Sequence, residues 1–171
     1  NLKKERLISQ DAKATYEVVK SVRDVYSGVI ITKLSPNVTD IVCIAKSAMD
    51  AGSDVLALIN TVAGMSIDIN KRLPRIANVS GGLSGPAIRP IAVKMVYDIY
   101  RKLKVPIIGM GGIIDLSSAL EFFIAGSSAI SIGTANFVYP RVTIEIIEGL
   151  KEYLTENKIS DIKELIGDLK I

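Results

Sequence analysis

The sequence contains no histidine, no tryptophan and a single cysteine, Cys43. Histidine is the commonest general base and metal ligand in proteins, and no other group of residues has metal-ligand spacing, so we expect no metal site. One cysteine cannot form an internal disulfide, which favours a cytoplasmic location. The residues around Cys43 have the apolar spacing of a helix, so we expect a buried, unreactive thiol.

Long apolar runs and a strong excess of one charge are also missing. No run approaches the roughly 18 apolar residues that span a bilayer, so we expect a soluble protein without a membrane partner. The net charge is +3, from 21 basic and 18 acidic residues, and the basic residues are mostly scattered, which argues against nucleic acid as a partner. The sequence begins at Asn1 rather than methionine, without a signal or transit pattern, and we interpret it as part of a longer protein.

Short apolar runs alternate along the sequence with segments of helical spacing. Apolar residues make up 49% of the sequence and aromatic residues 5%, a composition that suits helices packed on a parallel sheet. The runs at residues 29–34, 55–59, 107–108 and 129–132 are typical of buried strands. Residues 62–79 interrupt the alternation and predict an irregular loop or a small hairpin. The order of strands and helices predicts an α/β fold with parallel strands.

The helical spacing also indicates which side chains are buried and where helices begin. In residues 11–26, we expect a buried face made of Ala14, Val18, Val22 and Val25. The next helix, which ends at Gly52, has its apolar face at positions 41, 44, 45 and 48, with Thr39 or Asn37 as its cap. Further helices are expected up to about residue 104, after Asp115 as a cap, and over about 140–153. A final short helix is expected after Ser160.

An eightfold barrel of alternating strands and helices needs about 250 residues, whereas this sequence has 171. Four strands in an open sheet would leave two unpaired edges, which favour aggregation unless another segment covers them. We therefore interpret residues 1–171 as the carboxyl-terminal half of a single TIM (β/α)8 barrel domain, with about its last four βα units. A flavodoxin-like sheet is the alternative, but that fold places its phosphate loop after the first strand.

Glycines follow the last two predicted strands. Gly111 and Gly112 end one strand, and Gly133 with Thr134 ends the other. Glycine lets main-chain N–H groups approach an anion closely, and the following helix adds its positive end. In eightfold barrels, the turns after the last two strands are the usual phosphate site. The sequence therefore predicts a phosphate site, with tight βα turns as the alternative interpretation.

A third glycine cluster, Gly81, Gly82 and Gly85, surrounds Ser84 just before a helix, with Arg89 nearby. This arrangement predicts a further anion-binding turn.

Polar residues end the first two predicted strands. Lys33 lies near the end of an otherwise apolar run, where a cation either meets an anionic ligand or extends into solvent. Asn60 and Thr61 follow the next strand, where they either bond a planar polar ligand or cap the turn. Because the carboxyl ends of parallel strands share one rim, we expect these residues and the glycines to line one cavity.

Five segments of the sequence resemble dihydroorotate dehydrogenases. They are SPNVTDI (35–41), INT (59–61), NVSGGLSGPAIRPIA (78–92), IIGMGGI (107–113) and IGTANF (132–137). Among the classes of that family, the sequence looks most like the one that uses NAD through an iron–sulfur flavoprotein partner. Dihydropyrimidine dehydrogenase has a related SG-x-AIRPIA block, and it is the nearest rival.

The resemblance implies FMN as the cofactor and assigns ligand contacts to individual residues. Lys33 would contact the pyrimidine edge of the flavin, and the backbone of Ile59 would meet the ring. Asn60 and Thr61 would bond the orotate ring. The ribityl chain and phosphate would be held by five residues: Gly85, Gly111, Gly112, Gly133 and Thr134.

The resemblance also implies that the catalytic residue is not in this sequence. The general base of the family is the cysteine of a Cys-Pro-Asn segment, which we expect upstream of Asn1. Asn1 would then be the last residue of that segment and would bind the substrate. Cys43 does not fit the position of the base.

The implied function is the FMN-dependent oxidation of dihydroorotate to orotate in de novo pyrimidine biosynthesis. The implied partners are a subunit with FAD and an iron–sulfur cluster and further copies in an oligomer, while the electron acceptor stays open. Two alternatives stay open as well: reduction of uracil or thymine, and a non-catalytic phosphate-binding half-barrel.

Overall fold

The computed structural model describes residues 7–170, and its centre is a parallel sheet of four strands in the order β1-β2-β7-β8. All three strand pairings in this sheet are parallel, which confirms the predicted α/β fold. Asn1 lies outside the described residues. The strands are β1 (Ile31–Lys33), β2 (Val55–Leu58), β7 (Ile107–Met110) and β8 (Ala129–Ser131).

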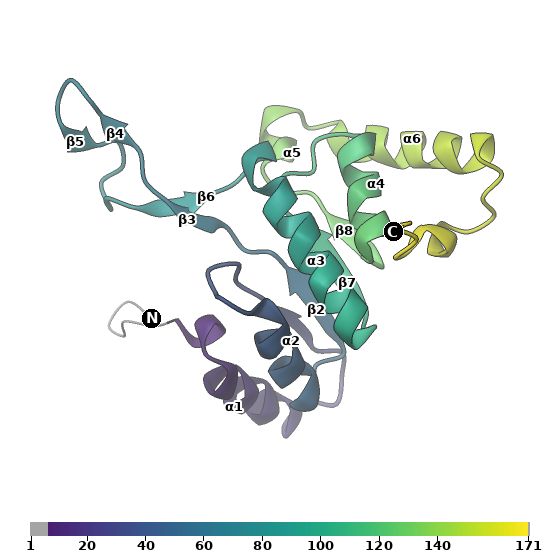
Figure 1. Cartoon of the computed structure of the whole chain (residues 1–171), viewed down its shortest axis with the longest axis horizontal. Helices are drawn as coiled ribbons and strands as arrows, with labels where there is room; N and C mark the ends of the chain where they lie inside the picture. The colour runs from purple at the N-terminus through teal and green to yellow at the C-terminus, as the bar shows by residue number, and fades with distance from the viewer. Residues whose placement is uncertain (1–6, 171) are drawn as a thin grey trace.

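Helices connect the strands of the sheet and pack beside one another in the order α1, α2, α3, α4 and α6 (Figure 1). Within the described residues, no helix has the length and apolarity needed to cross a membrane. The helices are α1 (Ala12–Arg23), α2 (Ile41–Asp50), α3 (Arg89–Leu103), α4 (Leu116–Ala125), α5 (Ala135–Val138) and α6 (Val142–Glu156). Three short 3₁₀ helices are η1 (Ile8–Gln10), η2 (Pro86–Ile88) and η3 (Ile162–Leu165).

The helices bury one face of the sheet and leave the other face without a covering layer in the described part of the chain. Leu56 pairs with Ile107 in register, and both side chains are fully buried. Successive side chains of a strand point to opposite faces, so Lys33 and its neighbours in register lie on the other face. At the two edge strands this face is exposed, at Ile31 and Lys33 of β1 and at Ser131 of β8.

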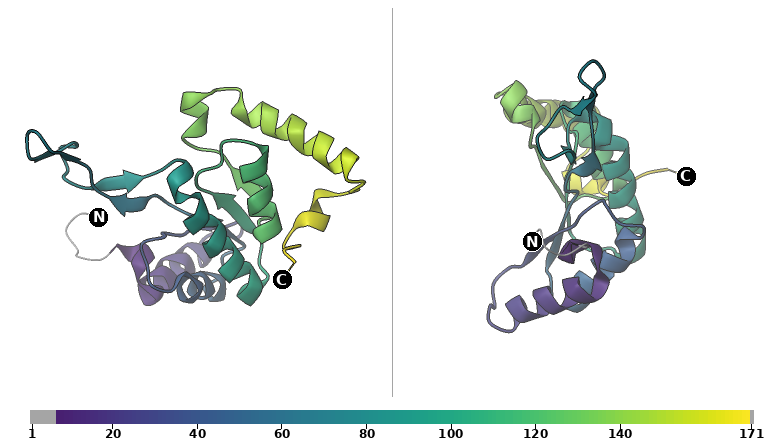
Figure 2. Two further views of the ribbon diagram at one scale, coloured as in Figure 1. Left: turned by 45° about the horizontal axis from the view of Figure 1, so that its top comes forward. Right: turned by 90° about the vertical axis from the view of Figure 1, so that its left-hand side faces the viewer.

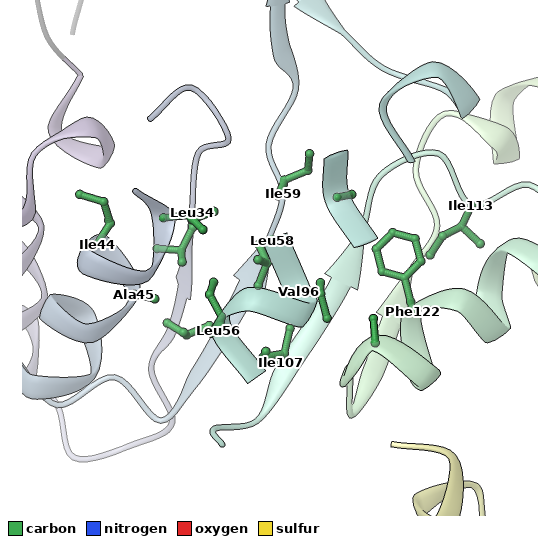
Figure 3. Packing of buried hydrophobic residues seen from close by; sticks show 14 of the residues in the cluster. Leu34, Ile44, Ala45, Leu56, Leu58, Ile59, Val96, Ile107, Ile113 and Phe122 are labelled. Carbon is green, nitrogen blue, oxygen red and sulfur yellow. The ribbon is translucent and has the colours of Figure 1, made fainter. Parts of the chain in front are cut away.

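The hydrophobic core lies between the sheet and the helices (Figure 3). Leu56 and Leu58 of β2 are completely buried, as are Val96 of α3 and Phe122 of α4. Burial of a large apolar side chain stabilises a fold by about 1.5–3 kcal/mol. These side chains therefore fix the helices against the sheet and hold the strands in their parallel order.

Helix α1 follows the predicted segment but buries a different stripe of side chains. Its buried residues are Thr15 and Val19, whereas Val18, Val22 and Val25 are exposed, so the predicted face is wrong. The reason is that α1 lies at the end of the helix layer and packs against α2. One narrow stripe is covered there, and the neighbouring valines point away from it.

Helix α2 buries the four predicted apolar positions, but its cap and its cysteine differ from the prediction. Asp40 caps the helix, and its Oδ1 accepts hydrogen bonds from the N–H groups of Val42 (2.9 Å) and Cys43 (3.2 Å). Cys43 is exposed, because its position lies outside the buried stripe. The expected caps Thr39 and Asn37 are therefore wrong, and so is the expected burial of the thiol.

Of the two other predicted caps, one is confirmed and one is wrong. Asp115 caps α4 as predicted, with its Oδ1 accepting from the N–H of Ser118 (2.8 Å). The last short helix, η3, is capped by Asp161 rather than Ser160. A carboxylate is the stronger acceptor, and the Ser160 hydroxyl instead donates to Glu164 (2.7 Å).

The predicted hairpin between β2 and α3 is present and forms an arm that projects from the sheet (Figures 1 and 2). It contains two antiparallel pairs, β3 with β6 and β4 with β5. The strands are β3 (Val62–Gly64), β4 (Ile67–Asp68), β5 (Leu73–Pro74) and β6 (Gly81–Leu83).

Replacement of Phe122 by alanine should lower the free energy of unfolding by about 3–5 kcal/mol, because it leaves a cavity in the core. The matched control is Phe137→Ala, because Phe137 is 90% exposed, and this change should cost less than about 0.5 kcal/mol. Urea denaturation of the two variants measures the difference. Equal losses of stability would contradict the packing described above.

Candidate functional site

The four strands of the sheet all point their carboxyl ends at one cavity of about 240 Å³. The last residue of β1 and the segments after β2, β6, β7 and β8 contribute to its lining. The structure brings together nine predicted site residues, and the exceptions among the described residues are Gly81, Gly82 and Arg89. The nine are Lys33, Ile59, Asn60, Thr61, Gly85, Gly111, Gly112, Gly133 and Thr134.

Main-chain hydrogen bonds continue beyond the end of β2 and fix the residues that follow it. The N–H of Ile59, which follows a cis peptide bond, donates to the carbonyl of Met110 (2.9 Å). The N–H of Asn60 donates to the carbonyl of Leu34 (3.0 Å). The backbone that carries Ile59 and Asn60 is thus held between its two neighbouring strands, beside Lys33 at the end of β1.

The glycines that line the cavity form a cradle of exposed main chain. Gly85, Gly111 and Gly112 have φ angles of +88°, +130° and +76°, which favour glycine. A Cβ atom on Gly112 would lie 2.7 Å from the carbonyl oxygen of Gly85, so the two turns touch. A Cβ atom on Gly85 or Gly133 would meet no atom within 4 Å. The main chain at these positions therefore faces open space, as an anion-binding turn requires.

Two glycines of the predicted third cluster have a different role. Gly81 and Gly82 belong to β6 and do not line the cavity. A Cβ atom on Gly82 would lie 2.1 Å from Oγ1 of Thr61, so glycine leaves room there for the threonine side chain. The prediction of an anion-binding turn is wrong for these two residues, because they pair with β3. The third glycine of the cluster, Gly85, does line the cavity, and its role in anion binding stays a prediction.

Arg89 also departs from the prediction, since it does not line the cavity. Its Nε lies 3.4 Å from Oε1 of Glu121, so the side chain joins the start of α3 to α4.

Among the described residues that line the cavity, Lys33 is the one charged side chain. It makes no ion pair with any other residue between positions 7 and 170. The cavity therefore combines a positive charge with neutral polar groups, which suits an anionic or electron-rich planar ligand.

The positive end of α4 is already occupied by its own cap. Hydrogen bonds from the Ser118 side chain and then from its main-chain N–H lower the pKa of the Asp115 carboxyl below its usual value. Asp115 does not line the cavity. This helix end is thus engaged by a side chain of the protein itself rather than open to an anion.

Several lining residues carried no clear signal in the sequence. Ser84 accepts a hydrogen bond from the Thr134 hydroxyl (3.0 Å), which ties the turn before η2 to the turn after β8. In the sequence, the one indication that Ser84 belongs to the site is its place between Gly82 and Gly85. The apolar lining residues, such as Met110 and Ile113, look like ordinary core residues in the sequence.

Comparison with known proteins gives one consistent result. The family described as dihydroorotate dehydrogenase matches residues 1–154. A relative from Caldicellulosiruptor bescii is 54% identical over 165 residues, which cover 96% of this chain and 55% of the relative. A relative from Geobacter sulfurreducens is 52% identical over 161 residues, which cover 94% of this chain and 53% of the relative. Both relatives are named dihydroorotate dehydrogenase B (NAD(+)), catalytic subunit.

The chain thus spans about half the length of the curated relatives it matches. The family match covers most of this chain and includes every residue that lines the cavity. On this evidence the chain belongs to the dihydroorotate dehydrogenase family.

Proposed function

We propose that residues 1–171 are the carboxyl-terminal half of a single FMN-binding barrel domain that oxidises dihydroorotate to orotate in pyrimidine biosynthesis. The observation that carries this proposal is that a lysine, a polar pair and a glycine cradle line the same cavity. Family membership supplies the chemical class of the reaction.

The open sheet supports the half-barrel part of the proposal. Strands β1 and β8 form its edges, and the sheet face that carries Lys33 has no covering layer within residues 7–170. Eight parallel strands close such a sheet into a barrel whose interior is filled with side chains. The matched region is only 55% of the relative from Caldicellulosiruptor bescii, and we propose that the rest of such a protein supplies the other four strands.

The glycine cradle fits the phosphate and ribityl chain of FMN. Main-chain N–H groups at Gly85, Gly112 and Gly133 would donate hydrogen bonds to phosphate oxygens, because a glycine has no side chain of its own to keep the phosphate away from the main chain. Thr134 adds a hydroxyl whose position is held by Ser84. When bound, FMN supplies the hydride acceptor of the reaction.

The remaining residues would orient the rings and stabilise charge. Lys33 would place its ammonium group at the ring edge, where it stabilises the negative charge of the reduced state. Asn60 and Thr61 would bond the planar pyrimidine and hold it in a reactive orientation. No carboxylate, thiol or imidazole lines the cavity in the described residues, so we propose that the base comes from the other half of the barrel.

The proposed partners follow from the names of the relatives. Those names state that NAD(+) is used and that the protein is a catalytic subunit. A catalytic subunit implies a further subunit, and we propose, from the family resemblance, that this partner carries FAD and an iron–sulfur cluster in an oligomeric cytoplasmic enzyme.

The complete protein should bind FMN, and Gly133→Val should weaken that binding at least tenfold, because the new side chain enters the open space of the cradle. The visible absorption spectrum of the purified protein measures the FMN content. Gly64→Val is the matched control, since a Cβ atom there makes only an ordinary contact of 3.5 Å with Leu83. A colourless preparation that takes up no FMN would contradict the proposed function.

Lys33→Ala should slow the reduction of the bound flavin by dihydroorotate about a hundredfold, because the positive charge at the ring edge is removed. Anaerobic stopped-flow absorbance measures this rate. Cys43→Ser is the control and should leave the rate nearly unchanged, since Cys43 is exposed on α2 and does not line the cavity. If Cys43→Ser abolished activity in a folded protein, the proposed source of the base would be wrong.

A further inference from the structure

The side chain of Asn37 joins the segment after β1 to the segment after β2. Its Nδ2 donates to the main-chain carbonyl of Thr61 (3.1 Å), and its Oδ1 accepts from the main-chain N–H of Ala63 (2.8 Å). The amide thus bonds the backbone on both sides of Val62, as a neighbouring strand would.

Asn37 is itself held in this position. The Ser35 hydroxyl accepts from the main-chain N–H of Asn37 (3.2 Å) and from its Nδ2 (3.3 Å), and Ser35 is buried. The side chain of Gln10 donates to the main-chain carbonyl of Asn37 (3.0 Å). The orientation of the amide is also fixed by chemistry, because its NH₂ group must face a carbonyl and its oxygen must face an N–H.

The segment that Asn37 holds carries the polar pair of the cavity. The main-chain N–H of Asn60 is bonded to Leu34, and the main-chain carbonyl of Thr61 is bonded to Asn37. On the other side of Thr61, Gly82 leaves the space that the threonine side chain occupies. The chain leaves the sheet for the β3–β6 arm at this point, so Asn37 restrains the polar pair where the regular sheet bonding ends.

Among the described residues, the hydrogen bonds of Asn37 go to Gln10, Ser35, Thr61 and Ala63, and none of these residues belongs to the glycine cradle. The cradle is built by the segments after β6, β7 and β8, and the Thr134–Ser84 hydrogen bond ties it together. Asn37 does not line the cavity either. A change at Asn37 therefore reaches the cavity through Thr61 and its neighbours rather than through the cradle.

We propose that Asn37 is a positioning residue for Asn60 and Thr61, which sets the affinity of the site for the pyrimidine without changing the affinity for FMN. This inference rests on the proposed function. It assigns a role to a side chain that touches neither the pyrimidine nor the cofactor. The side chain acts by fixing the main chain that presents Asn60 and Thr61.

The test uses Asn37→Asp in the complete flavoprotein. This change keeps an oxygen for the N–H of Ala63 but removes the donor to the carbonyl of Thr61, so two oxygens would face each other. The dissociation constant of orotate, measured from the change in the flavin spectrum, and the KM for dihydroorotate should both rise about tenfold. The FMN content and the melting temperature should stay close to those of the unmodified protein, and kcat should change less than about threefold.

Asn157→Asp is the matched control. The side chain of Asn157 also donates to a main-chain carbonyl, that of Tyr153 (2.8 Å), but it lies at the end of α6 and does not line the cavity. Orotate affinity should be unchanged in this variant. Asn37→Ala removes both hydrogen bonds of the side chain and should weaken orotate binding at least as much as Asn37→Asp.

Three outcomes would overturn the inference. If both Asn37 variants bind orotate as the unmodified protein does, Asn37 does not position the pair. If they lose FMN or unfold together with the loss of orotate binding, Asn37 is a general structural residue. If the unmodified protein binds FMN but not orotate, the proposed function itself fails, a result that the unmodified protein alone reveals.

Discussion

The parallel alignment of β1, β2, β7 and β8 is the constraint on which the site depends. Parallel strands end at the same edge of a sheet, so residues far apart in the chain reach one cavity only while the register is kept. The register is kept by burial, because completely buried side chains of β2 and β7 pack against α3 and α4. The hydrophobic face of the sheet thus fixes the position of the polar rim.

The rim itself depends on backbone rather than on side-chain chemistry. Gly85, Gly111 and Gly112 have positive φ angles, and Gly133 faces open space. These glycines line the cavity without side chains of their own, and Lys33 adds the one charge among the described lining residues. In the proposed function such a rim holds a phosphate and the edge of a ring, while no carboxylate, thiol or imidazole lines it in the described residues. A rim with binding groups but without a base is what we expect of a chain that spans about half the length of its relatives.

The sequence predicts the parts of this structure that depend on local signals. The approximate positions of the four sheet strands, the glycine turns and the cap at Asp115 follow from neighbouring residues, and the cavity residues follow from strand order. The predictions are wrong where a residue's role or burial depends on a segment that is distant in the sequence. Gly81 and Gly82 look like an anion-binding turn, but they pair with β3. Val18 and Val22 have helical spacing, yet α1 packs on α2 through Val19. The role of Asn37 depends on contacts with residues 61 and 63, which no local pattern indicates.

The central claim is that one rim holds both ends of a flavin beside a pyrimidine. A crystal structure of the complete protein with FMN and orotate tests it most directly. The account predicts phosphate oxygens about 3 Å from the main-chain nitrogens of the glycine cradle, the flavin ring edge beside Lys33, and orotate against Asn60 and Thr61. A flavin bound elsewhere, or a phosphate that contacts neither Gly112 nor Gly133, would contradict it.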